Sequence, residues 1–281
     1  MNHSFLKTFK AGDPNTIGYF DRLVSFKSRT EFILGYIEHK EKFIKIMEEL
    51  WAFLTAIEDH DVVIDLQSDK RFPLVQQYLT EKWHEYISLI ETDMAERFLS
   101  SKRNFSQTNS VLAEEDYVGV NSELSLLSGK LTNLGIIMVG CGPFPETLME
   151  VYKGANDIKY AIGIEGRVEI SQLANRVVAQ VFPGVENVKV IAIDAESFDY
   201  ADADVIFLAN GLIKKDSILQ RIYGTAKDNV KVLARNPILM GRLFYEDLYT
   251  LPSLQSFIIC GSVRASKLSE TILFQKRDKT I

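Results

Sequence analysis

Five residues in the second half of the chain follow short apolar runs, in positions that suit the binding of a nucleoside. They are Gly140, Gly142, Glu165, Asp194 and Asn210. If each run is a strand of one parallel sheet, its carboxyl end lies at the rim where such sheets bind ligands. A carboxylate at the second end, about 20 residues past a glycine turn, can accept hydrogen bonds from both ribose hydroxyls. We therefore expect Glu165 to bind a ribose; the alternative is an acid that begins a helix and stabilises its dipole.

The glycine turn narrows the choice of ligand. The apolar run before it breaks into Gly140-Cys141-Gly142-Pro143, and the glycines permit a tight turn to which a ligand can come close. The third glycine of a dinucleotide motif is missing, and Pro143 removes an N–H that a pyrophosphate would use. The turn, with Gly140, Gly142 and Pro143, therefore favours a ligand that has an adenosine but no phosphates, namely S-adenosylmethionine.

The ends of the third and fourth runs suit the two ends of that ligand. Asp194 can accept a hydrogen bond from the adenine amino group, and the backbone N–H of Ala195 can meet a ring nitrogen; the alternative is an ordinary loop aspartate. Asn210 ends the fourth run at the same rim. It either meets the methionine end of the ligand or caps the turn that follows.

An acid also lies within an apolar stripe of the first half. Apolar residues recur at helical spacing from Trp83 to Phe98. Glu91 lies four residues after Ile87 and three before Met94, so it projects with them. An acid on a burying face needs a reason, and a carboxylate in partly apolar surroundings can act as a base. The alternative is a glutamate at the edge of the stripe that reaches solvent or pairs with a cation.

The first half is predicted to be mostly helical. Apolar residues recur at threes and fours over 17–54, 74–99 and 124–131, with breaks around 59–61 and 68–73. No strand is expected before residue 130. The pattern predicts an all-helical domain over residues 1–130, which can serve as a lid.

After residue 135 the pattern changes to apolar runs of strand length, and the stretches between the first five runs suit helices. The runs are 135–140, 159–165, 187–193, 204–209, 230–234 and 256–260. A last run, 270–276, is expected to be an added edge strand that pairs with 256–260. This alternation predicts an α/β fold: a methyltransferase-type Rossmann domain over residues 131–281 with a mainly parallel, seven-stranded sheet.

Composition excludes several other functions. The chain has 281 residues, 46% of them hydrophobic and 25% charged, as is ordinary for a globular protein. Its net charge of −6 argues against general nucleic-acid binding. No apolar stretch is long enough to span a bilayer and no secretory signal opens the chain, so we expect a cytoplasmic protein without membrane partners. Two cysteines predict no disulfide framework, and no metal cluster, Ser-His-Asp spacing or P-loop is visible.

Three stretches resemble one known family. Val139 to Thr147 is similar to the Gly-x-Gly-Pro-x-Pro-x-Thr signature of nicotianamine synthases and of their bacterial relatives that make staphylopine- and pseudopaline-type metallophores. Arg235 followed by Gly241-Arg242-Leu243-Phe244-Tyr245 resembles the Arg…Gly…Phe…Tyr stretch of that family, and 271–276 resembles its last strand. The resemblance spans roughly residues 86–276 and is strongest at the glycine turn.

The resemblance implies a particular reaction. Members of this family join a helical domain to a methyltransferase-like domain, and they transfer the 3-amino-3-carboxypropyl group of S-adenosylmethionine to an amine, releasing methylthioadenosine. Glu91 matches the active-site glutamate, which implies a catalytic base. Tyr117 matches a tyrosine that can orient the substrate; the alternative is an aromatic side chain that ends a polar linker and only packs against the core. The implied partner is a small-molecule amino acid such as histidine, or a second S-adenosylmethionine, and a homodimer is possible.

One departure from the family concerns the acceptor side. Gly166-Arg167 follows Glu165 where relatives commonly have another acid and a proline. This departure bears on the acceptor more than on the donor. Three alternatives to the implied reaction stay open: cyclisation of S-adenosylmethionine to azetidine-2-carboxylate, an ordinary methyltransferase with a helical lid, and a Rossmann domain that only binds. The by-product distinguishes an aminocarboxypropyltransferase from a methyltransferase, because the first releases methylthioadenosine and the second releases S-adenosylhomocysteine.

Overall fold

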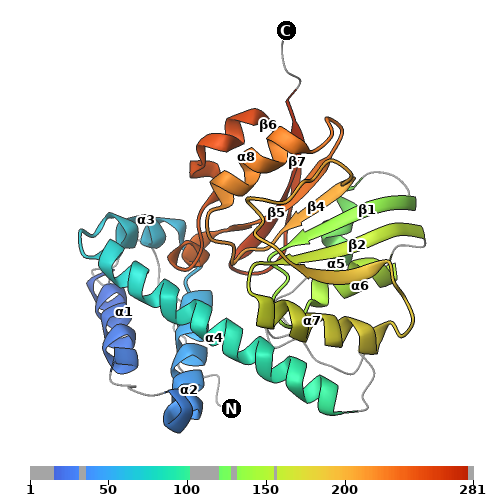
Figure 1. The fold of residues 1–281 in the computed structure, drawn as a ribbon. Helices are drawn as coiled ribbons and strands as arrows, with labels where there is room; N and C mark the ends of the chain where they lie inside the picture. Colours follow the sequence, from blue (N-terminus) through green and yellow to red (C-terminus); the bar gives the residue numbers. More distant parts are fainter. Residues whose placement is uncertain (1–15, 32–35, 102–119, 128–131, 155–156, 278–281) are drawn as a thin grey trace. The chain divides into compact units, whose positions relative to one another are not determined.

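The chain forms two compact units. The structure is a computed structural model that describes residues 16–31, 36–101, 120–127, 132–154 and 157–277 (Figure 1). The first unit comprises Met1–Ile87 and Ile238–Tyr245, and the second comprises Ser88–Pro237 and Glu246–Ile281. This division differs from the expected boundary at residue 130 for two reasons. The end of a long helix, from Ser88 onward, packs with the second unit, and the excursion Ile238–Tyr245, which follows a strand of the sheet, packs with the first.

The described residues of the first unit are helical. They form α1 (Thr16–Glu31), α2 (Tyr36–Thr55), α3 (His60–Ser68), the first half of α4 (Phe72–Ser100) and the 3-10 helix η2 (Leu239–Leu243). Asp59 begins α3 by accepting a hydrogen bond of 2.9 Å from the N–H of Asp61. Pro73 lies in the first turn of α4, where a missing N–H breaks no helical hydrogen bond. The expected break at 68–73 is therefore only a short link between two helices.

Stacked aromatic rings tie the excursion 238–245 to the helices of its unit. Trp83 lies between Trp51 and Phe244, with ring centroids 5.1 Å and 4.4 Å away and nearly parallel planes. The indole N–H of Trp83 donates to the hydroxyl of Tyr245 at 2.5 Å. The side chain of Thr80 donates to the carbonyl of Leu243 at 2.8 Å. The stretch that resembles the family motif is thus a structural part of the helical unit.

The second unit contains the predicted seven-stranded sheet, in the order β3-β2-β1-β4-β5-β7-β6. The first five strands run parallel, and β7 is antiparallel to both of its neighbours. The strands are β1 (Thr132–Val139), β2 (Asp157–Glu165), β3 (Val188–Ala192), β4 (Val205–Leu208), β5 (Lys231–Pro237), β6 (Phe257–Arg264) and β7 (Ser269–Lys276). The predicted fold class, a methyltransferase-type Rossmann domain, is confirmed.

Helices cover both faces of this sheet (Figure 1). They are α5 (Val120–Ser125), α6 (Glu146–Gly154) and α7 (Val168–Val181) with the end of α4 on one face, and α8 (Lys215–Thr225) with the 3-10 helices η3 (Leu248–Thr250) and η4 (Pro252–Ser256) on the other. Successive residues of β1 alternate between the two cores: Ile136 and Met138 face the first, Ile137 and Val139 the second. Burial on both faces explains why the strands read as continuous apolar runs.

Two details of the predicted sheet were wrong. The last strand is not at the edge: β7 lies between β5 and β6, so β6 is the edge strand. The stretch between β3 and β4 forms no helix, because its acids make local turns instead. Asp194 and Asp199 each accept a hydrogen bond from the backbone N–H two residues on, at 2.9 Å and 3.0 Å.

None of the helices in the described part of the chain combines the length and the apolar character that crossing a membrane requires.

Candidate functional site

The glycine turn after β1 has the backbone that its sequence predicts. Gly140 and Gly142 have φ angles of +75° and +64°, in the left-handed region that favours glycine. The N–H of Gly140 donates to the carbonyl of Ile164 at 2.9 Å, which joins the turn to the end of β2. Pro143 is buried directly after the turn. The turn is therefore fixed by its glycines and by the neighbouring strand.

Glu91 lies directly against this turn. A Cβ atom built on Gly142 would be 2.5 Å from Oε2 of Glu91, closer than side chains tolerate. The end of α4 is held in the second unit by buried Ala95 and Phe98, and the ring of Phe98 meets that of Phe144 edge to face at 5.7 Å. The absence of a side chain at Gly142 thus makes room for the carboxylate that the apolar stripe predicted.

The surroundings of Glu91 change its acidity. The side chain is half-buried, and desolvation by burial raises its pKa to about 8. The guanidinium of Arg167 acts against this rise, whereas Glu165 and Glu146 add to it and Arg235 opposes it more weakly. A carboxyl with this pKa is largely protonated at neutral pH and becomes a base just above it, where amines also lose their protons.

Glu165 ends β2 as predicted, and it is 7% exposed. Its Oε1 accepts two hydrogen bonds from Arg167, one from Nε at 2.9 Å and one from the backbone N–H at 3.2 Å. Oε2 makes no hydrogen bond with the described residues, so one oxygen of this carboxylate remains for a hydroxyl. Arg167 was not predicted as a site residue. The only signal for it in the sequence is that arginine stands where the family commonly has another residue.

Asp194 and Ala195 follow β3, whose end is joined to β2 because the N–H of Ile193 donates to the carbonyl of Glu165 at 3.1 Å. Asp194 is exposed, and its Oδ1 accepts from the N–H of Glu196 at 2.9 Å. The carbonyl of Ala195 accepts from the hydroxyl of Tyr200 at 3.0 Å. The structure therefore shows a turn-forming aspartate at the expected rim, and its contact with an adenine stays a prediction.

Asn210 follows β4 next to the glycine turn, since the N–H of Ala209 donates to the carbonyl of Val139 at 3.1 Å. Its Oδ1 is buried and has no hydrogen-bond partner among the described residues. A buried acceptor without a donor is costly. An ammonium group is a suitable donor for this oxygen, and both the contact of Asn210 with the methionine end of the predicted ligand and its role as a turn cap stay predictions.

Tyr117, the second predicted catalytic residue, lies outside the described residues. The thiol of Cys141 is buried, and desolvation raises its pKa far above the usual range. A thiol of that kind does not ionise at physiological pH, so Cys141 is a packing residue and not a nucleophile.

A buried ion pair beneath the rim was not predicted. Arg235 on β5 donates to both carboxylate oxygens of Glu123 on α5, at 2.8 Å and 2.9 Å, and Glu123 is 1% exposed. Thr271 on β7 donates to the same carboxylate at 2.5 Å, and Arg235 also donates to Thr147 at 3.1 Å. Glu123 and Arg235 are 112 residues apart in the chain, so only the fold brings them together.

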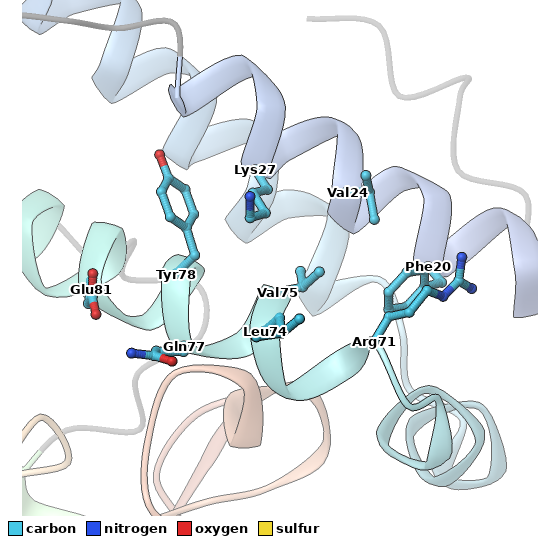
Figure 2. Close-up of a pocket in the computed structure, with 9 residues that line it drawn as sticks. All are labelled: Phe20, Val24, Lys27, Arg71, Leu74, Val75, Gln77, Tyr78 and Glu81. Atoms are coloured by element: carbon cyan, nitrogen blue, oxygen red, sulfur yellow. The ribbon is translucent and has the colours of Figure 1, made fainter.

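A hollow of about 590 Å³ lies in the first unit between α1 and α4 (Figure 2). It contains none of the predicted site residues. Its two cations are already engaged: Lys27 pairs with Glu31 and faces the ring of Tyr78, and Arg71 pairs with Asp69 at 2.7 Å and faces Phe20. Because these charges are satisfied within the unit, the hollow offers little chemistry for a ligand.

The order of the sheet and the glycine turn after its first strand define a Rossmann domain of the methyltransferase type. No family model and no curated protein matches the sequence. Among solved structures, the chain is similar to nicotianamine synthase MtNAS in three forms: a glutamate-to-glutamine variant (TM-score 0.77), that variant with S-adenosylmethionine (0.76) and a complex with MTA and tNA (0.76). In each comparison the identity is 16%, with 92% of this chain and 98% of that chain covered. This likeness shows a shared fold, and it confirms the resemblance at that level.

Proposed function

We propose that this protein is an S-adenosylmethionine-dependent transferase of the nicotianamine synthase type, which moves the 3-amino-3-carboxypropyl group to an amine and releases methylthioadenosine. The observation that carries the proposal is the carboxyl of Glu91 against the glycine turn, 2.5 Å from the position of a Cβ on Gly142. A base at that turn suits the deprotonation of an attacking amine beside a bound nucleoside.

The rim suits this donor in four ways. Oε2 of Glu165 is an acceptor for ribose hydroxyls. Oδ1 of Asn210, which has no hydrogen-bond partner in the described part of the chain, is an acceptor for the amino group of the methionine chain. Asp194 is exposed at the next strand end, where it can accept from the adenine amino group. Pro143 disfavours a pyrophosphate, which the donor lacks. The same residues accommodate the leaving methylthioadenosine, which keeps the ribose and the adenine.

The proton balance assigns a role to Glu91. The donor supplies a γ-carbon next to a sulfonium, and the bond from that carbon to sulfur breaks toward sulfur while the nitrogen of the amine bonds to the carbon. The nitrogen must lose one proton for the product amine to be neutral, and the Glu91 carboxylate takes it. Burial raises the pKa of Glu91 to about 8, so its affinity for that proton is close to the affinity of an amine.

The solved structures that this chain resembles support the proposed transferase activity. MtNAS has been crystallised with S-adenosylmethionine and with MTA, the usual abbreviation of methylthioadenosine. A glutamate-to-glutamine variant of MtNAS was also crystallised, and Glu91 of this chain is the glutamate at the glycine turn. A role in metallophore biosynthesis, a homodimer and a lid function of the helical residues stay predictions.

The decisive experiment is incubation with S-adenosylmethionine, alone and with each of the common amino acids, followed by mass spectrometry of all products. Methylthioadenosine together with an adduct of the amino acid is the expected result. Methylthioadenosine with azetidine-2-carboxylate and no adduct indicates the intramolecular reaction. S-adenosylhomocysteine overturns the proposal in favour of a methyltransferase, and calorimetric binding of the donor without turnover overturns it in favour of a binding domain.

A further inference from the structure

The turn after β2 carries an arginine, Arg167, that contacts both Glu165 and α4, the helix to which Glu91 belongs. Arg167 binds one oxygen of Glu165 twice, through Nε and through its backbone N–H. Its side chain is 54% exposed, whereas that of Glu165 is only 9% exposed. An ion pair between two exposed side chains contributes little, but a guanidinium that fixes a largely buried carboxylate also orients its second oxygen.

The same guanidinium reaches the helix that carries Glu91. Nη1 of Arg167 donates to Oγ of Ser88 at 3.4 Å. Ser88 and Glu91 are three residues apart on α4 and therefore share one face of the helix. Arg167 thus contacts the ribose side of the site directly and the base side through α4.

Four charged groups act on Glu91 from the elements packed against it. Arg167 and Glu165 belong to the end of β2 and the turn that follows, Glu146 to α6, and Arg235 to β5. Arg235 is paired with both oxygens of Glu123, so its charge is largely compensated where it lies. Arg167 is therefore the main cation that favours the carboxylate form of Glu91, and two acids oppose it.

We infer that Arg167 is a positioning residue that couples the ribose-binding carboxylate Glu165 to the base Glu91. When ribose hydroxyls take up part of the charge of Glu165, the guanidinium is released toward α4 and favours the ionised base, so that the base is activated once the donor is bound. By linkage, ionisation of Glu91 strengthens donor binding by the same factor. The inference rests on the proposed function only for the roles of Glu165 and Glu91.

The test follows the Glu91 carboxyl directly. In protein labelled with ¹³C at glutamate side chains, the Glu91 resonance is identified by its loss in Glu91→Gln and titrated by NMR in the ligand-free state. In Arg167→Gln the titration midpoint should rise by about one unit, the low end for a lost opposite charge at close range. Arg167→Lys, which keeps the charge, should restore most of the midpoint, and Ser88→Ala should raise it less. Arg176→Gln removes an exposed arginine of α7 and should leave it unchanged.

A second readout tests the coupling. Adenosine carries the ribose without the sulfonium charge, so it should lower the Glu91 midpoint in the native protein and lower it less in Arg167→Gln. Calorimetry should also show S-adenosylmethionine binding weakened by up to about fivefold in Arg167→Gln, as expected for a lost ion pair.

Unchanged midpoints in folded Arg167→Gln and Ser88→Ala would overturn the inference, as would an adenosine effect equal in the native protein and in Arg167→Gln. If Arg167→Gln does not fold, Ser88→Ala and Arg167→Lys still decide, because a midpoint unchanged by Ser88→Ala removes the link to α4. None of these measurements requires turnover. A protein that forms no methylthioadenosine therefore refutes the proposed function, while the midpoints still support or refute the role of Arg167.

Discussion

Glu91 is the residue whose replacement says most about the chemistry. Glu91→Gln keeps the shape of the side chain, so donor affinity should stay nearly native, while turnover should fall by roughly the 10²–10⁴-fold that a positioned base contributes. Because burial raises the pKa of Glu91 to about 8, the native kcat/KM should fall as the pH drops below about 8. Product formation measured by mass spectrometry over a pH series gives both results.

A matched control is Glu96→Gln, which changes an exposed glutamate of the same helix and should leave the rate at its native value. A Glu91→Gln enzyme that forms methylthioadenosine at the native rate with its true acceptor would remove Glu91 from the mechanism. In that case the base must be sought elsewhere, and Tyr117 is the next residue to replace.

Glu165 tests the donor site separately. Glu165→Ala removes a charged acceptor from the ribose, and hydrogen bonds to charged groups contribute roughly 1.5–3 kcal/mol each, so affinity for S-adenosylmethionine should fall at least about tenfold. Glu169→Ala, at an exposed position in the first turn of α7, should bind normally. Calorimetry decides: equal affinity in folded Glu165→Ala refutes the ribose assignment.

At the scale of the element, the glycine turn and the end of α4 act as one structure. Gly142→Ala adds a Cβ at a φ of +64° and places it 2.5 Å from Oε2 of Glu91. We expect this variant to lose activity by displacing the base as well as donor affinity by straining the turn. Gly224→Ala in α8, where an added Cβ meets nothing within 4 Å, should keep both and gain up to about 1 kcal/mol of stability. Native activity in Gly142→Ala would show that the contact with Glu91 is dispensable.

Helices and strands with a clear pattern of apolar residues could be predicted from the sequence, whereas contacts between these elements could not. The parallel strands were predicted correctly because burial on both faces makes each an apolar run. The partly buried position of Glu91 was predicted because a single acid interrupts a helical stripe. The place of β7 inside the sheet was missed, since apolar content does not tell an edge strand from an inner antiparallel one. The helix expected between β3 and β4 was wrong because Asp194 and Asp199 form local turns there. The contact of Arg167 with α4 was missed because its partner, Ser88, lies 79 positions earlier in the chain.

At the scale of the whole molecule, Glu91 links activity to stability. The pKa of Glu91 is about 8 in the folded protein, whereas that of an ordinary glutamate is 4.5, so between these pH values the folded state binds more protons than the unfolded state. The contribution of this group to the free energy of unfolding therefore falls as the pH rises from about 4.5 to about 8. The free energy of unfolding of Glu91→Gln minus that of the native protein should rise over the same window. Urea titrations at pH 5, 7 and 9 measure it; a flat difference would show that burial does not raise the pKa of Glu91.

The stacked side chains of Trp51 and Trp83 provide an intrinsic fluorescence probe of unfolding. These are the two tryptophans of the chain, and both belong to the first unit, so tryptophan emission reports the helical unit alone. The second unit has a chemical probe in the buried thiol of Cys141, once the exposed thiol of Cys260 is removed by Cys260→Ser. Because α4 belongs to both units, loss of emission and labelling of Cys141 should share one midpoint in denaturant. Two separate midpoints would show that each unit melts independently.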